Sequence, residues 1–142
     1  MPYTADQAEA VKSTIATLRP NATKHAQDFF IFYMKKCPGD LNKFPNYKGK
    51  AIDSLPSVPQ FSGHVTAVLT EALVLFEIAH DAGALAARGK AQVASHVPRN
   101  VGSTEFGNLL GALTEFLKQE LGGSFDAAAW GNATTQVLAA LK

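Results

Sequence analysis

Apolar residues recur every three or four positions along almost the whole chain, which is the spacing of helices that bury one face. The pattern predicts a first helix after Thr4–Gln7, a stretch that fits a capping box, and Pro20 ends it. A second helix is predicted from about Asn21 to just before Pro38. Residues 38–56 are rich in proline and glycine, so we expect a winding connection with short helical turns there.

The second half of the chain predicts four more helices. One runs from Pro59 to about His80, and an alanine-rich one then ends around His96. The latter is weakened by an internal glycine, Gly89. A strongly apolar helix is predicted up to the glycine pair at 122–123, and a last one opens with Ser124 as its N-cap. No segment alternates as a strand does, so we predict an all-α fold of about six principal helices in one domain, residues 1–142.

Composition narrows the classes of function. The chain has 142 residues, 46% of them hydrophobic, and a formal net charge of +1, which disfavours nucleic-acid and anionic-membrane partners. A single cysteine cannot form an intrachain disulfide framework or a thiolate metal cage. The N-terminal stretch carries charges where a signal peptide would be apolar, so we expect a cytoplasmic protein with no membrane segment.

Four histidines are therefore the main candidates for site chemistry. His64 lies on the apolar face of its predicted helix, between Phe61 and Val68 at helical spacing. By itself this position suits either a hydrogen-bonded core histidine or a group aimed at a bound molecule. His96 lies at a helix end, where a histidine often only interacts with the helix dipole.

Taken together, the two histidines indicate a site. His96 follows His64 by 32 residues, enough for one helix to end, turn and return as a second helix across the first. Phe30, Phe44 and Tyr47 would add aromatic walls between them. A slot of this kind suits a flat, apolar cofactor with a metal at its centre.

Several segments together resemble the globin family, over most of the chain from about Thr23 to Leu141. The resemblance is closest to invertebrate haemoglobins and myoglobins, especially the annelid coelomic globins that include dehaloperoxidases, while 93–101 also resembles insect-larval haemoglobins. The segments that carry it are Ala26-Gln-Asp-Phe29, Lys36-Cys-Pro38, Lys43-Phe-Pro-Asn-Tyr-Lys-Gly-Lys50, His64-x-x-x-Val68, Val93-Ala-Ser-His96-x-Pro-Arg99 and the closing pattern from Phe106 to Trp130.

The resemblance implies a globin fold around haem b, with His96 as the proximal iron ligand and His64 as the distal histidine. His25 and His80 would serve neither role. The residues that it assigns to haem binding are Phe44, Tyr47, His64, Val68, Ser95, His96, Arg99, Val101 and Phe106. Those that it assigns to the ligand pocket are Phe30, Tyr33, Phe44, His64, Val68 and Leu69.

The function implied is reversible binding of dioxygen and other small gaseous ligands, for oxygen transport or storage, by a monomer or weak homodimer. The alternative is a dehaloperoxidase-like enzyme that oxidises small halophenols with hydrogen peroxide, in which His64 would be the catalytic acid and base. Residues 60–71 contain no arginine that could stabilise developing charge beside His64, and this favours the oxygen-binding function.

Overall fold

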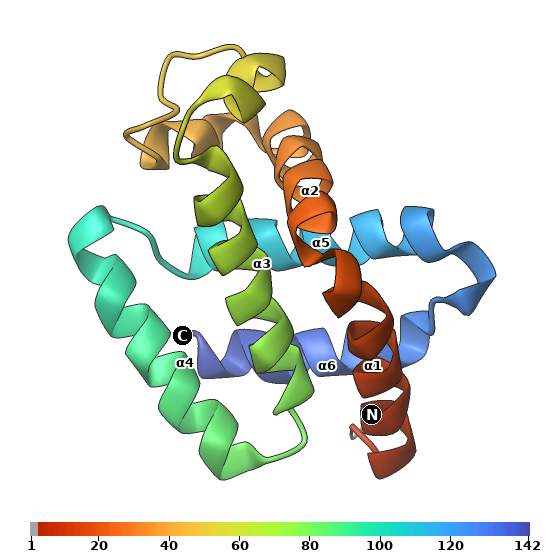
Figure 1. The fold of residues 1–142 in the computed structure, drawn as a ribbon. Coiled ribbons are helices and arrows are strands. Elements are labelled where there is room, and N and C mark those ends of the chain that lie inside the picture. Colours follow the sequence, from red (N-terminus) through yellow and green to blue (C-terminus); the bar gives the residue numbers. More distant parts are fainter. Residues whose placement is uncertain (1–2) are drawn as a thin grey trace.

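The computed structural model describes residues 3–142 and is all-helical there, as predicted. Its six α-helices are joined by short 3-10 turns (Figure 1). The helices are α1 (Ala5–Leu18), α2 (Ala22–Lys36), α3 (Phe61–Glu77), α4 (Ala82–His96), α5 (Ser103–Leu121) and α6 (Ala127–Ala140).

The helices pack in two crossed layers. In Figure 1, α1, α2 and α3 lie in front of α5 and α6, which run past each other in opposite directions, and α4 flanks α3 on the outer side. Large side chains fill the space between the layers. Trp130 packs on Phe76 with ring centroids 4.6 Å apart, and Phe29 packs on Phe116 at 5.8 Å. Because rings of this size bury much apolar surface, they hold the two layers together.

Polar side chains fix where three helices begin. The predicted capping box is present in α1, where Thr4 Oγ1 accepts from the backbone N–H of Gln7 at 3.1 Å. Asp81 caps α4 in the same way, accepting from Ala84 N at 3.0 Å. The predicted N-cap of the last helix, Ser124, is wrong, because the cap is Asp126. Ser124 ends a separate 3-10 turn, Gly122–Ser124.

The helix that carries His64 is shorter than predicted at both ends. Pro59 lies in a turn that the bond from Phe61 N to Val58 O closes at 3.0 Å, and α3 begins after it. At the other end α3 stops at Glu77, and a further turn leads directly to the cap of α4. This tight connection returns α4 beside α3, as the spacing of the two histidines requires.

The proline- and glycine-rich connection is anchored by a buried carboxylate. Tyr33 Oη of α2 donates to Asp40 Oδ2 at 2.5 Å, and Asn108 Nδ2 of α5 donates to the same oxygen at 3.2 Å. Asp40 is only 9% exposed, so these donors offset the cost of burying it. These hydrogen bonds fix the beginning of the connection, a few residues before Phe44 and Tyr47.

Candidate functional site

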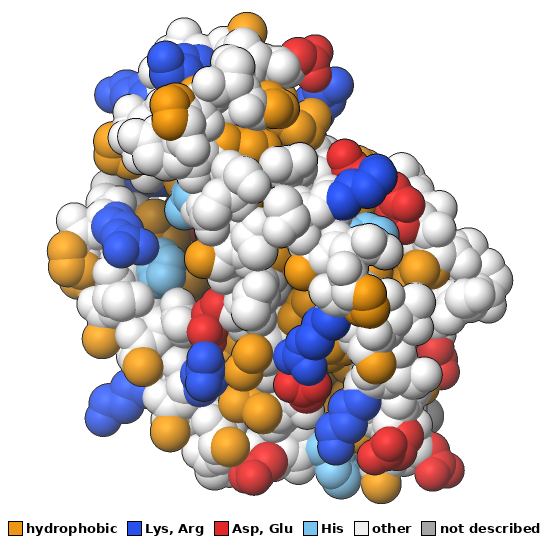
Figure 2. Space-filling model, in the orientation of Figure 1, with side chains coloured by type: hydrophobic (Ala, Val, Ile, Leu, Met, Phe, Trp, Pro, Cys, Tyr) orange, Lys and Arg blue, Asp and Glu red, His pale blue; other side chains and the backbone are white. Residues whose placement is uncertain are grey.

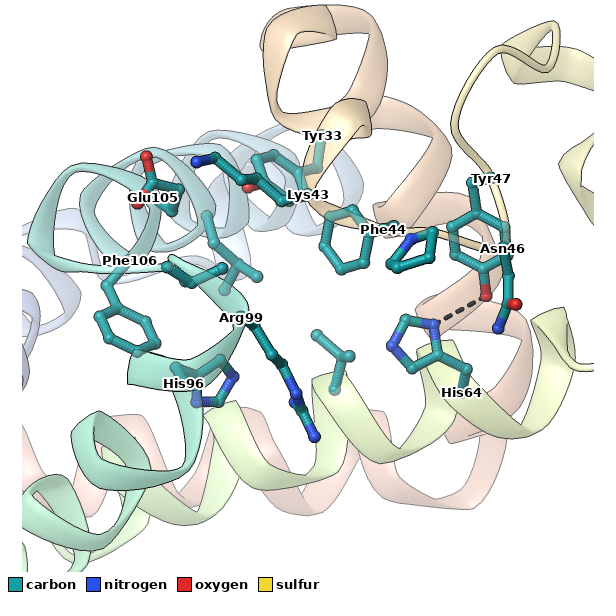
Figure 3. A pocket seen from close by; sticks show the side chains of 14 residues that line it. Tyr33, Lys43, Phe44, Asn46, Tyr47, His64, His96, Arg99, Glu105 and Phe106 are labelled. Carbon is teal, nitrogen blue, oxygen red and sulfur yellow. Dashed lines mark hydrogen bonds between the residues drawn. The ribbon is translucent and has the colours of Figure 1, made fainter.

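A cleft opens between α3, α4, α5 and the connection at residues 43–47 (Figure 3). It consists of two cavities, of about 280 and about 360 Å³, that share six lining residues and that we treat as one cleft. The shared residues are His64, Val68, His96, Arg99, Phe106 and Leu109. In Figure 2 a hollow with histidine side chains at its edge is visible on the left of the molecule.

His64 reaches the cleft from the first half of α3 and is half-buried. Its Nδ1 lies 2.7 Å from the hydroxyl of Tyr47, and the close-up shows its other nitrogen directed toward the open space (Figure 3). Burial lowers the pKa of His64 below the usual histidine value, and the positive charge of Arg99 lowers it further. The imidazole is therefore neutral at physiological pH.

His96 reaches the cleft from the last residue of α4. Its Nδ1 lies 2.7 Å from the carbonyl oxygen of Gln92, one helical turn earlier, and 3.1 Å from Ser95 Oγ. Since a carbonyl can only accept, Nδ1 carries the proton and donates to it. Phe106 packs edge-on against the imidazole with centroids 5.1 Å apart. The ring is thus oriented, and Nε2 keeps its lone pair free to bind a metal.

The two imidazoles face each other across the cleft from different helices (Figure 3). Phe44 lies above the space between them, and the guanidinium of Arg99 extends toward that space from the turn after α4. Lys43 adds a second cationic side chain to the lining. This arrangement can hold a flat apolar group with a metal at its centre and acidic substituents at its edge.

Most of the residues predicted for the site line the first cavity, but three do not. The lining includes Tyr33, Phe44, Tyr47, His64, Val68, His96, Arg99, Val101 and Phe106. Phe30 is fully buried behind the wall, its ring 5.2 Å from that of Phe44 and 6.0 Å from that of His64. Leu69 is buried in the core, and Ser95 lies at the exposed end of α4.

Other lining residues were not predicted from the sequence. Pro45, Asn46, Glu105 and Leu109 line the first cavity, and the second adds Ala67, Glu71, Ala72, Leu75, Gln92, Leu110 and Leu141. Helical spacing could have found some of them, since Glu71 comes seven residues after His64 and Leu109 three after Phe106. Leu141 has no such signal, because only the tertiary fold brings the end of the chain to the cleft.

The other two histidines lie away from the cleft. His80 is exposed, with its ring edge-on to Tyr3, and His25 is half-buried in the first turns of α2. Within residues 3–142 no three side chains of the histidine, cysteine, aspartate and glutamate types gather as a metal site. None of the helices described has both the length and the apolar character to span a membrane.

Comparisons of the sequence with protein families and with curated proteins all find globins. A family model described as Globin matches residues 27–141. Globin-1 of Liolophura japonica is 30% identical over 124 residues, which are 87% of this chain and 83% of that protein. Globin CTT-VI of Chironomus thummi thummi is 30% identical over 83% of this chain and 72% of its own.

Solved structures show the same fold. The azide complex of ferric Aplysia limacina myoglobin has a TM-score of 0.86 at 23% identity, covering 98% of this chain and 96% of its own. A cyanide-binding, hexa-coordinate haemoglobin of Drosophila melanogaster has a TM-score of 0.83 at 19% identity and covers 97% and 92%. The expected likeness to annelid dehaloperoxidases is not tested by these comparisons and stays a prediction.

Proposed function

The chain belongs to the globin family, and we propose that it binds haem b in the cleft and holds dioxygen reversibly, with His96 as the iron ligand and His64 facing the gas. The observation that carries this proposal is the opposed pair of imidazoles, one on α3 and one on α4, across a single aromatic cleft. Ferric Aplysia limacina myoglobin binds azide and the Drosophila melanogaster haemoglobin binds cyanide, so small ligands of this kind are the class that we propose to bind here.

The chemistry of the cleft supports haem. Its walls are mainly aromatic and aliphatic, as a porphyrin face requires, and Nε2 of His96 is left with a free lone pair by the bond from Nδ1 to Gln92 O. Lys43 and Arg99 are cationic side chains of the cleft lining that would be available to pair with the carboxylates of a haem. A porphyrin brings four nitrogen ligands of its own, so one imidazole completes what the protein must supply.

Bound haem would supply an iron atom that takes dioxygen or carbon monoxide. His64 would act on the gas through a hydrogen bond from Nε2. The lowered pKa of His64 keeps its imidazole neutral. A hydrogen bond to an acceptor with negative charge contributes about 1.5–3 kcal/mol, so it strengthens binding by about one to two decades. Carbon monoxide gains less charge and benefits less.

The aromatic wall keeps bulk water away from this hydrogen bond. Phe30 is fully buried and its ring supports both Phe44 and His64 from behind. Val68 follows His64 by one helical turn and lines the same cleft. Excluding water would strengthen the interaction of the donor with the ligand and would slow oxidation of the iron by dioxygen.

Titration of the haem-free protein with ferrous haem tests the proposal. Wild-type protein is expected to bind one haem and to take up oxygen reversibly, whereas His96→Gly is expected to lose more than about tenfold in haem affinity, or more than about 1.4 kcal/mol. Added imidazole should restore the spectrum of the variant, because it supplies the missing ligand. His80→Gly is the matched control, since His80 is exposed away from the cleft. Equal haem affinity in both variants would contradict the proposal.

The peroxidase alternative stays untested by fold and relatives alike. One structural feature bears on it: Arg99 lies near enough to His64 to lower its pKa, although 60–71 contain no arginine. Steady-state oxidation of a halophenol by the ferric protein with peroxide decides between the two functions. Rapid turnover would favour the enzyme, and slow bleaching of the haem would favour the oxygen carrier.

A further inference from the structure

The hydrogen bond between Tyr47 and His64 joins the proline-rich connection to the first half of α3. The Tyr47 hydroxyl lies 2.7 Å from His64 Nδ1, the nitrogen that faces away from the open space (Figure 3). Tyr47 itself is held by a backbone turn, in which its N–H donates to Phe44 O at 2.9 Å and its carbonyl accepts from Lys50 N at 3.0 Å. The backbone of Tyr47 is thus held in place on both sides of the side chain.

Packing leaves both rings little freedom. Tyr47 is 1% exposed, and its ring packs against Phe30 and Phe61 with centroids 5.6 and 5.9 Å away. The ring of His64 contacts Phe30 and Phe44, with centroids 6.0 and 5.7 Å away. The hydrogen bond therefore forms between two groups that are already oriented by their aromatic neighbours.

The direction of this hydrogen bond decides which nitrogen of His64 carries the proton. A buried phenol proton needs an acceptor, and within residues 3–142 the hydroxyl of Tyr47 has one hydrogen-bond partner, His64 Nδ1. If His64 carried its proton on Nδ1, the phenol would accept and its own proton would be left without a partner. The phenol donates instead, Nδ1 accepts, and Nε2 holds the proton.

The two histidines of the cleft thus meet opposite partners. Nδ1 of His96 faces a carbonyl that can only accept, which leaves a lone pair on Nε2. Nδ1 of His64 faces a phenol that donates, which leaves a proton on Nε2. Two identical side chains are given different chemistry by the atom at Nδ1: one is a ligand for a metal and the other is a hydrogen-bond donor.

We propose that Tyr47 is a positioning residue that fixes His64 as a donor at Nε2 and thereby keeps it from becoming a second ligand to the iron. The proposal rests on the proposed function, because it concerns the same site. Loss of the Tyr47 hydroxyl frees the His64 ring to carry its proton on either nitrogen, and the form with a lone pair on Nε2 is then able to coordinate.

Tyr47→Phe tests this, because it removes the hydroxyl and keeps the ring. The matched control is Tyr3→Phe, which removes a buried hydroxyl that has no hydrogen-bond partner among residues 3–142 and lies outside the cleft. The first readout is ¹⁵N–¹H NMR of labelled histidine, which shows the protonated nitrogen of His64 in the haem-free chain and in the ferrous carbon monoxide complex. Wild type and Tyr3→Phe are expected to carry the proton on Nε2, and Tyr47→Phe to show both forms.

The second readout uses the haem-loaded protein. Without added ligand, ferrous Tyr47→Phe is expected to gain a six-coordinate, bis-histidine spectrum that wild type and Tyr3→Phe lack. Its oxygen dissociation is expected to be about threefold to tenfold faster, the loss of one ordinary hydrogen bond. Carbon monoxide dissociation should change less, which separates the loss of a donor from general loosening of the wall.

A proton on Nδ1 of His64 in the wild type would overturn the inference, and that result needs no variant to fold. The inference would also be overturned if Tyr47→Phe kept the wild-type tautomer of His64, the wild-type iron coordination and the wild-type rate of oxygen dissociation. Failure of the proposed function can be told apart from failure of this inference. If the chain takes up no haem, NMR of the haem-free protein still shows which nitrogen of His64 carries the proton.

Discussion

The two helices that carry the histidines differ in how firmly the rest of the protein holds them. α3 buries seven of its 17 residues and lies against α1, α2 and α6. α4 buries only Leu85 and Gly89 of its 15 residues and packs chiefly on α6. One wall of the cleft is therefore built by the protein core, while the wall that bears His96 has little apolar contact of its own. Bound haem would supply that missing contact.

The difference follows from the sequences of the two helices. α3 has several large apolar side chains, such as Phe61, Leu73 and Phe76, so it buries more of its surface than α4 does. α4 consists mainly of small and polar residues, which give it little to bury and a modest intrinsic stability. A helix of this kind can respond to the cofactor without disturbing the core.

Leucine truncation on each helix is the change with the largest expected effect. Leu73→Ala in α3 should cost about 2–5 kcal/mol in unfolding free energy, whether haem is present or not, because it leaves a cavity in the core. Leu85→Ala in α4 should lower the unfolding free energy by less. Most of that loss should be seen in the haem-bound form, because the account has α4 held in place by its contact with haem. Denaturant unfolding of both forms measures this. A Leu85 variant as damaged as the Leu73 variant in the haem-free chain would break the comparison.

Gly89 lets α4 lie directly against the backbone of α6 at Ala140. A methyl group at this position would overlap the backbone oxygen of Ala140, so Gly89→Ala must push the helices apart. We expect a loss of about 1–3 kcal/mol, the usual range for overpacking, together with faster haem loss. Gly83→Ala in the same helix is the control, since its methyl group would meet only Asp81 Oδ1 at 3.7 Å. Equal stability of the two variants would show that α4 does not dock tightly on α6.

The ion pair between α4 and α3 has the smallest expected effect. Arg88 binds Glu71 through two hydrogen bonds of 2.7 Å, but the side chains remain 46% and 27% exposed. Arg88→Gln should cost at most about 1 kcal/mol, and less in high salt, since solvent and ions screen the pair. Lys24→Gln, which removes a pair inside α2, is the control for thermal unfolding with and without haem. If Arg88→Gln lost more than about 1 kcal/mol of stability, the ion pair rather than contact with the cofactor would hold α4 in place.

Much of the fold could be predicted because helical periodicity is local. The apolar spacing located all six helices, and the order of motifs paired His64 with His96. Helix ends were less predictable: Ser124 and Asp126 are both good caps, and only the backbone decides that Asp126 serves. Gly89 was predicted to weaken α4, but its contact with Ala140 depends on tertiary packing that no local pattern reveals.

The same limit applies to the candidate site. The sequence indicated that Tyr47 would line the cleft, but not that its hydroxyl would meet Nδ1 of His64. Nor did it indicate that Asp40 would be buried between Tyr33 and Asn108, because Asn108 lies far from Asp40 along the chain. Such contacts determine protonation and orientation, so the sequence located the candidate histidines and the structure was needed to distinguish their chemistry.

Hydrogen exchange of the haem-free and haem-bound chain, resolved by helix, tests the central claim most directly. The account predicts that, without haem, amides of α4 exchange at least about 100-fold faster than those of α3, and that haem protects α4 in wild type but not in His96→Gly. Equal protection of α3 and α4 without haem, or no gain of protection in α4 when haem binds, would contradict it.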